Sequence, residues 1–409
     1  MEKVVIYIIV IYSMYLFIKK RLYFDFLSLM FFSTLFYFLP FLFGFVIIKE
    51  KGIVKYISIN SKTYNIAIIL FLCILIVTYL YDKYIRVKIK QNIYYVPMDK
   101  GFDKFCIYLF CIISILFYMI QGRFMIGKIR DLSNMIGIYK IWSNMILILG
   151  GVSIVSNNKL GVFLSILGAI FDLYLGDRTI FIILVIILTT YILIKKCNRG
   201  IIYYKKIIVI ILLIIAPLVF YKKLIGPIQR GNIDEFVARI TNIETYIDSI
   251  VSIEPFTTQC ILNEVISKNY KIKENTLVSI RNLIPLIEKT KYSTFNEQMQ
   301  KELFEGIEYG MGSNVWAEVY SNLSIIALYI MILIYLFIGV IGNILFEKID
   351  TYKLKVIILI SFSFFIFYIH RNSIVYQINL NLRVIYLYIG ILCIYRILKK
   401  ISEINIISF

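Results

Sequence analysis

Long apolar blocks alternate along the chain with short clusters of lysine and arginine. Blocks such as "IFIILVIILTTYILI" and "IIVIILLIIAPLVF" contain no charged residue. A helix needs about 20 apolar residues to cross a hydrocarbon core of about 30 Å, and only helices or closed barrels satisfy their peptide groups there. Because the blocks are continuous and do not alternate between apolar and polar residues, they predict membrane-spanning helices.

The blocks predict an all-α, polytopic integral membrane protein with about 11 transmembrane helices, between about 10 and 12. In the first block the basic residues Lys19, Lys20 and Arg21 follow the apolar run, which is typical of a span and not of a cleaved signal. Pro40 and Gly44 interrupt the second block, which is either one tilted helix or a tight hairpin. The predicted spans are 4–18, 22–48, 64–81, 105–120, 141–156, 160–175, 179–194, 207–221, 320–342, 356–369 and 380–396.

Composition agrees with this pattern, because 60% of the 409 residues are hydrophobic and the mean hydropathy is +0.83. The net charge of +19 belongs to the membrane part of the chain, and we expect no nucleic-acid partner. The six cysteines have no spacing typical of a metal site or a disulfide framework, so we expect small apolar residues there.

Loop charge predicts the orientation, because lysine and arginine stay on the cytoplasmic side. With the N-terminus outside and the C-terminus inside, the inner segments hold 21 basic residues, and the short outer segments together with Arg383 at the start of the last span hold 12. We therefore expect a multi-pass membrane protein with its N-terminus outside and its C-terminus in the cytoplasm.

One long, nearly neutral loop, residues 222–314, separates a membrane part at 1–221 from another at 315–409. Loops this long are usually functional or disordered. Apolar residues at helical spacing in "IDEFVARITNIETYIDSIV" predict an amphipathic helix, and "TLVSIRNLIPLIEK" and "STFNEQMQKELFEG" predict further short helices. We expect one membrane domain with an inserted extracytoplasmic helical loop that covers a site at the outer surface.

The outer ends of the predicted spans carry cations, and ionisable groups in a membrane are functional candidates by default. Arginine offers a permanently charged, planar fork that matches phosphate oxygens, so converging arginines suit an anionic lipid headgroup. The same positions also fit interfacial anchors or, for the lone histidine, a structural role. The candidates are Arg123, Lys128, Arg130, Arg178, His370, Arg371 and Arg383.

A polar stripe begins the ninth predicted span in "GMGSNVWAEVYSNL", where Asn314, Glu318 and Asn322 follow at i, i+4 and i+8 beside Ser321. Ser313 or Asn314 is the expected N-cap. A carboxylate near a helix N-terminus is stabilised by about 0.3–1 kcal/mol, which explains Glu318 but not its polar neighbours. We expect Glu318 to lie inside the bundle, where it pairs with an arginine or acts as a base.

Together these motifs resemble the bacterial O-antigen and capsule repeat-unit polymerases of the Wzy type, relatives of O-antigen ligases. The resemblance rests on the Gly-x-Arg turn in "LGDRTIF", the long outer loop with "LVSIRNLIPLIEKTKY", the stretch "GMGSNVWAEVYSNL" and the later "HRNS". Order and spacing match over residues 105–385. One departure is "NLSIIAL", which stands where the family has aromatic residues and glycines.

The resemblance implies a GT-C-like polymerase/ligase fold and a metal-independent glycosyltransferase without a cofactor. The substrate would be an undecaprenyl-pyrophosphate-linked oligosaccharide, with membrane lipid, a chain-length regulator and a flippase as further partners. Arg178, Arg281, Arg371 and Arg130 would neutralise the leaving pyrophosphate, with Arg383, Asn314 and Asn322 as further binding residues. Glu318 and then His370 are the candidate bases. The first outer loop holds the single carboxylate Glu50, which disfavours the metal-dependent enzymes of this fold.

Three other functions stay open. An O-antigen ligase shares the donor and differs in the acceptor. A multi-span transporter or flippase of lipid-linked glycan would place its polar groups near the midplane of broken helices, whereas polar residues here gather at the outer ends. An acyltransferase would need a histidine in the reaction centre, and the single histidine lies late in the chain.

Overall fold

The computed structural model describes residues 1–21, 23–50, 53–86, 99–121, 137–175, 177–196, 221, 224, 226–228, 231–251, 253–272, 281, 294–307 and 311–407. It is mostly helical. Five of the described helices are long and apolar enough to cross a membrane: Ser61–Arg86, Lys100–Ile120, Ile138–Val155, Ile325–Lys348 and Ile374–Ser402. The chain is therefore a helical membrane protein, as the apolar blocks predicted.

The first part of the chain contains most of the bundle. Its elements are α1 (Glu2–Tyr15), a π-helical turn (Leu16–Lys20), α2 (Phe26–Tyr37), α3 (Leu39–Phe43), β1 (Phe45–Glu50), β2 (Ile53–Ser58), α4 (Ser61–Leu80), a second π-helical turn (Tyr81–Arg86), α5 (Lys100–Gln121), α6 (Ile138–Val155), α7 (Lys159–Tyr174) and α8 (Thr179–Lys196). The long loop contributes α10 (Ile233–Thr241), α11 (Ile243–Val251), α12 (Glu254–Ser267) and α14 (Phe295–Leu303). The last part contains α15 (Val315–Asn322), α16 (Ile325–Lys348), α17 (Tyr352–Tyr368) and α18 (Ile374–Ile407).

Helices lie in ten of the predicted apolar blocks. The remaining block, 207–221, lies outside the described residues except for Tyr221, and so does the predicted loop helix at "TLVSIRNLIPLIEK" except for Arg281. The predicted helix in "STFNEQMQKELFEG" is confirmed as α14, which begins with a capping box between Thr294 and Glu297. The amphipathic stretch forms two helices, α10 and α11, which are separated at Asn242.

For two predicted spans, the predicted helix limits are wrong. The block 22–48 is neither one helix nor a helical hairpin, because α2 ends at Tyr37 and residues from Phe45 form a strand. This strand pairs antiparallel with β2, with Phe45 opposite Ser58 and Glu50 opposite Ile53. The block 320–342 is also interrupted, because α15 ends at Asn322 and a new helix with Ser324 as its N-cap begins at Ile325.

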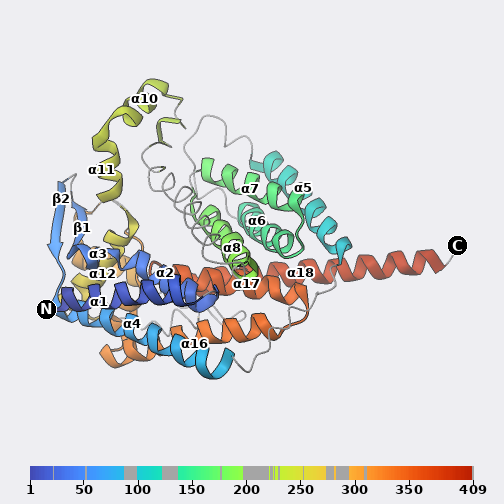
Figure 1. Cartoon of the computed structure of the whole chain (residues 1–409). Helices are drawn as coiled ribbons and strands as arrows, with labels where there is room; N and C mark the ends of the chain where they lie inside the picture. The colour runs from blue at the N-terminus through green and yellow to red at the C-terminus, as the bar shows by residue number, and fades with distance from the viewer. Residues whose placement is uncertain are drawn as a thin grey trace.

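Helix α17 joins two groups of helices, because it packs against α2 and α16 on one side and against α6 and α8 on the other. The β-hairpin, α3 and α10–α12 lie at the end of the bundle that carries the N-terminus, whereas α18 takes the C-terminus to the opposite end (Figure 1). Helices α10, α11 and α12 of the long loop therefore share an end of the bundle with the N-terminus (Figure 1).

Helix α12 of the long loop is a core element and not only part of a cover. Ten of its residues are buried, and it packs against β1, α2, α4 and α15. Asn263 holds it to the start of α4, because its Oδ1 accepts a hydrogen bond from the backbone N–H of Asn60 at 2.8 Å and its Nδ2 donates to the carbonyl of Ser58 at 3.2 Å. This rigid attachment positions Glu254, the first residue of α12, at one end of the bundle.

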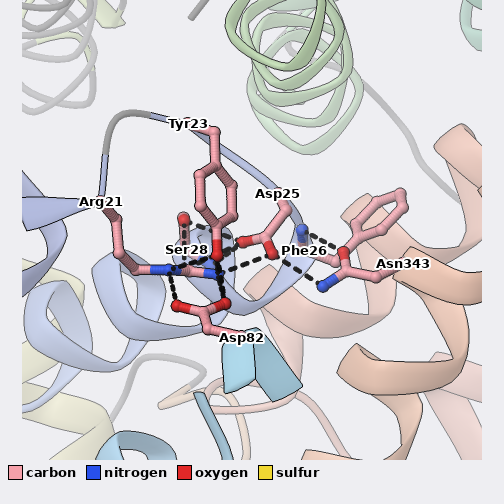
Figure 2. Close-up of polar contacts among 7 residues, drawn as sticks. All are labelled: Arg21, Tyr23, Asp25, Phe26, Ser28, Asp82 and Asn343. Atoms are coloured by element: carbon pink, nitrogen blue, oxygen red, sulfur yellow. Dashed lines mark hydrogen bonds and ion pairs between the residues drawn. The ribbon is translucent and has the colours of Figure 1, made fainter. Parts of the chain in front are cut away.

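At the opposite end of α1, Arg21 is buried in an ionic network (Figure 2). Its guanidinium donates to both carboxylate oxygens of Asp25 and of Asp82, with the closest contacts at 2.9 Å, and to the Ser28 hydroxyl at 3.0 Å. Tyr23 also donates its hydroxyl hydrogen to Asp82. Two carboxylates around one guanidinium compensate for the loss of water around these charges.

Asp25 extends this network to α16. Its Oδ2 accepts a hydrogen bond from Asn343 Nδ2 at 2.9 Å, and the Asn343 side-chain oxygen accepts one from the backbone N–H of Phe26 at 2.8 Å (Figure 2). Arg21 was expected among the charges of a short inner segment, but it is an internal connection between α1, α2, α4 and α16.

Replacement of Arg21 by glutamine is expected to destabilise the fold by about 3–5 kcal/mol, because Asp25 and Asp82 remain partly buried without their cation. The thermal midpoint of the purified protein in detergent measures this change. Lys20→Gln is the matched control, because Lys20 is the exposed neighbouring cation. Equal midpoints for both variants would contradict a structural role of the network.

Candidate functional site

The turn between α17 and α18 forms one wall of a cavity of about 250 Å³. The turn lies beside the end of α2, since the rings of Phe38 and His370 are 5.7 Å apart. Four other segments meet it there: the start of α8, α14, the residues before α15 and the first turn of α18. The lining residues are Thr179, Asn296, Gly312, Ser313, Arg371, Asn372, Ser373 and Tyr376. The fold thus joins the Gly-x-Arg turn, the end of the long loop and the "HRNS" segment.

Arg371 is the cation on the cavity wall, and 23% of its side chain is exposed. Its Nε forms an ion pair with the Glu254 carboxylate of α12, and its guanidinium lies 5.6 Å from the centre of the Tyr368 ring. Its carbonyl accepts a hydrogen bond from the backbone N–H of Ser313 at 2.9 Å, which fixes the turn to the segment before α15. This site therefore already accepts an oxyanion, supplied in the structure by Glu254.

The structure also describes two further predicted arginines, Arg178 and Arg383. Arg178, half-buried just before α8, interacts electrostatically with Arg371, whose pKa is lowered by burial and by that like charge. Arg383, on α18, donates from Nε to Asn379 Oδ1 at 3.0 Å, and it shares an electrostatic interaction with the Tyr376 hydroxyl. Arg178 therefore lies close enough to Arg371 for the two charges to interact, whereas Arg383 is linked to the cavity only through Tyr376, which lines it.

Several polar atoms at the cavity have no hydrogen-bond partner among the described residues. They are the Ser313 hydroxyl, the Asn372 amide nitrogen and the Asn296 side-chain oxygen. The Ser313 residue is only 2% exposed. Buried polar groups are normally hydrogen-bonded, and an unsatisfied one costs about 1–3 kcal/mol. Their gathering at one cavity is therefore typical of a site that receives a polar ligand or ordered water.

Glu318 lies inside the bundle, as predicted, but not against an arginine. It is 3% exposed, and its Oε2 accepts a hydrogen bond from the backbone N–H of Ile374, the first residue of α18, at 2.9 Å. In the described part of the chain it forms no ion pair, and Arg371, which lies in the same turn region, is paired with Glu254. Glu318 thus supports the turn that carries Arg371.

The environment of Glu318 also changes its acidity. Burial raises the pKa of its carboxyl to about 7, while the hydrogen bond from Ile374 opposes this change. A general base is most effective when its pKa is close to the operating pH. Glu318 is not among the residues that line the cavity. It is connected to the cavity through the backbone N–H of Ile374, because the preceding residue, Ser373, lines the cavity.

His370 does not have the surroundings of a base. Its Nδ1 accepts a hydrogen bond from Trp316 Nε1 at 3.0 Å, and its Nε2 lies 3.2 Å from the Thr34 hydroxyl and 3.3 Å from the Tyr335 hydroxyl. The side chain is fully buried, and burial lowers the pKa of the imidazole to about 3. Both ring nitrogens have partners inside the bundle, and His370 does not line the cavity, so these surroundings favour the structural alternative.

The two asparagines of the polar stripe also have structural positions. Asn314 is the N-cap of α15, as expected, since its Oδ1 accepts from the backbone N–H groups of Trp316 and Ala317. Its Nδ2 donates to the Thr258 carbonyl of α12 at 3.0 Å. Asn322 donates to the Glu318 carbonyl one turn earlier at 2.8 Å. Neither residue is among those that line the cavity, so the binding role expected of both stays a prediction.

The remaining predicted arginines add nothing to this geometry. Arg130 lies outside the described residues, together with Arg123 and Lys128. Arg281 is an exposed helical residue whose neighbours in sequence lie outside them as well.

No protein-family model, no curated protein and no solved structure matches the chain. The function of the cavity is therefore inferred from its own residues.

Sequence reasoning did not select four of the residues that now define the site. Ser313 and Asn372 lie in the motifs "GMGSNVWAEVYSNL" and "HRNS", but their neighbours Asn314 and Arg371 were predicted as the binding residues of these motifs. Asn296 and Glu254 had no signal, because they lie in helices whose orientation toward the bundle is decided by tertiary packing.

Proposed function

We propose that the chain is a membrane glycosyltransferase that polymerises undecaprenyl-pyrophosphate-linked oligosaccharide repeat units into a surface polysaccharide. The observation that carries the proposal is the cavity wall at Arg371, where Arg178 interacts electrostatically with Arg371 and the Glu254 carboxylate pairs with the guanidinium. Converging arginines at one end of a membrane bundle suit a phosphorylated lipid headgroup, because guanidinium groups bind phosphate oxygens in a bidentate manner.

The proposed reaction displaces the pyrophosphate from the anomeric carbon of the donor sugar. A hydroxyl oxygen of the acceptor forms the new bond to that carbon, and the bonding electrons of the broken carbon–oxygen bond leave with the pyrophosphate. Arg371 and Arg178 stabilise the charge that develops on the leaving group, which is often the largest catalytic contribution. Arg383, and from the sequence Arg281 and Arg130, would extend this positive surface.

The proton of the acceptor hydroxyl requires a base, for which we propose Glu318. Its buried carboxyl has a pKa of about 7, so a large fraction of it is ionised and able to accept a proton at neutral pH. No step of the proposal requires a metal ion or a cofactor.

The proposal includes an orientation in the bacterial inner membrane. The end with the hairpin, α10–α12 and the cavity faces outward, where lipid-linked repeat units are joined, and the C-terminus is cytoplasmic. The predicted excess of basic residues in the inner segments supports this orientation. A chain-length regulator and a flippase would act with the protein.

Deletion of the gene tests the proposal in cells. We expect the surface glycan to carry single repeat units instead of long chains, and a plasmid copy to restore the long chains. Gel electrophoresis of the surface polysaccharide measures the chain length. Normal chain length after deletion would exclude a polymerase, and long polymer that stays unattached would indicate a ligase.

A further inference from the structure

The cavity contains more than the arginine that the proposed reaction needs. The residues that line the cavity differ in charge: Arg371 is positively charged, whereas Ser313, Asn296 and Asn372 are neutral. The Ser313 hydroxyl and the Asn372 amide can also donate to phosphate oxygens, but an ionised pyrophosphate offers no hydrogen to the Asn296 side-chain oxygen. A ligand that satisfies all three residues must therefore carry a hydrogen-bond donor as well.

The unpartnered atoms of these three residues differ in hydrogen-bonding type. The Asn372 amide nitrogen donates, the Asn296 side-chain oxygen accepts and the Ser313 hydroxyl does both. A sugar hydroxyl can donate and accept as well, so a ring with several hydroxyls satisfies all three. A hydrocarbon chain would leave all of them unsatisfied at a cost for each buried group.

The three residues come from separate segments whose backbones are held in place. Gly312 adopts a positive φ of 82°, which directs the chain into Ser313, and the Ser313 N–H is bonded to the Arg371 carbonyl. Asn372 follows Arg371 in the same turn, where its backbone N–H donates to the Tyr368 carbonyl at 3.1 Å. Because these backbones are already fixed, less conformational entropy is lost when a ligand binds.

We propose that Ser313, Asn372 and Asn296 form a subsite for one sugar ring, the ring directly bonded to the phosphate that Arg371 receives. This proposal rests on the proposed function. It adds the position of the first sugar and the residues that distinguish a glycosylated lipid pyrophosphate from a lipid pyrophosphate without sugar. Asn296 brings α14 of the long loop into contact with this sugar, which gives the loop a part in substrate selection.

The cavity volume agrees with this assignment. A volume of about 250 Å³ corresponds to roughly eight water molecules at about 30 Å³ each. One sugar ring fits such a space, whereas a whole repeat unit of several sugars does not. The rest of the glycan must then extend out of the cavity.

Two probes test the subsite: a short polyprenyl pyrophosphate, and the same lipid pyrophosphate with one hexose attached. Their dissociation constants are measured by calorimetry with the full-length protein in detergent. We expect the hexose to tighten binding to the wild type by about 10-fold, and Ser313→Ala or Asn372→Ala to weaken binding of the glycosylated probe by about 3- to 10-fold. Binding of the bare probe should stay unchanged in both variants.

Asn296→Ala is a third variant on a separate helix, and thermal midpoints check that each variant is folded. Arg371→Gln is the contrasting variant, because it should weaken both probes alike. Equal binding of the two probes by the wild type, or equal weakening of both by Ser313→Ala, would overturn the subsite and leave the pyrophosphate site in place. Binding of neither probe would overturn the proposed function as well.

Discussion

Replacement of Arg371 by glutamine is expected to reduce the rate of polymerisation by about 100-fold or more, since loss of one group that stabilises developing charge costs about 10²–10³ in kcat. Arg371 is the arginine on the cavity wall, and its guanidinium already holds a carboxylate. The rate is measured as glycan chain growth with purified protein in liposomes.

The variant also leaves Glu254 without its cation, so a second variant, Arg371→Gln with Glu254→Gln, removes both charges of the pair. Loss of activity in the double variant, with a normal thermal midpoint, would assign the effect to the arginine itself. Arg239→Gln is the matched control, because Arg239 on α10 also pairs with a glutamate, Glu235, at 2.6 Å. Wild-type rates in the Arg371 variants would contradict its role at the leaving group.

Replacement of Glu318 by glutamine is expected to reduce kcat by about 10²–10⁴, the range for removal of a general base. The glutamine oxygen can still accept the hydrogen bond from Ile374, so the turn keeps its support. Glu318→Ala removes both functions. Full activity of the glutamine variant together with an inactive, unstable alanine variant would show that Glu318 only holds the start of α18.

The pH dependence gives a second measurement on Glu318. Since the carboxylate is the base and its pKa is about 7, the rate should rise with pH up to about 7 and then level off. Stability should change in the opposite direction. The folded carboxyl keeps its proton above the ordinary value of 4.5, so the thermal midpoint should fall as the pH rises from 4.5 to about 7.

Glu318→Gln should remove the contribution of Glu318 to the pH dependence of the rate and to the pH dependence of the thermal midpoint. Glu264→Gln should leave both pH dependences unchanged. Glu264 is the control because it pairs with Lys268 at 3.0 Å on α12, away from the cavity. A pH profile of the wild type without an inflection near 7 would contradict the role of Glu318 as base.

Apolar continuity was sufficient to predict most of the helices, because a buried membrane helix such as α6 has no polar face to obscure its limits. Apolar continuity failed where one apolar block forms more than one helix or strand. Residues from Phe45 onward are apolar and β-branched, which fits a strand as well as a helix, and they form β1 against α12. The break at Ser324 was missed because a single serine is a weak signal in an apolar run.

The candidate site could be predicted only in part. Glycines, arginines and polar residues at the ends of apolar blocks indicated the segments of Arg178, Ser313 and Arg371, and the structure brings those segments together. Which side chain faces the cavity depends on contacts distant in sequence. The Asn314 side chain donates a hydrogen bond to the Thr258 carbonyl of α12, and the His370 ring accepts one from Trp316 of α15. Both side chains are therefore oriented by tertiary packing.

Purified protein in liposomes with undecaprenyl-pyrophosphate-linked repeat units tests the proposed polymerase most directly. The polymerase proposal predicts a ladder of glycans longer than one repeat, with release of undecaprenyl pyrophosphate and no ladder for the folded Arg371→Gln variant. A folded wild-type protein that leaves every repeat unit single would contradict it.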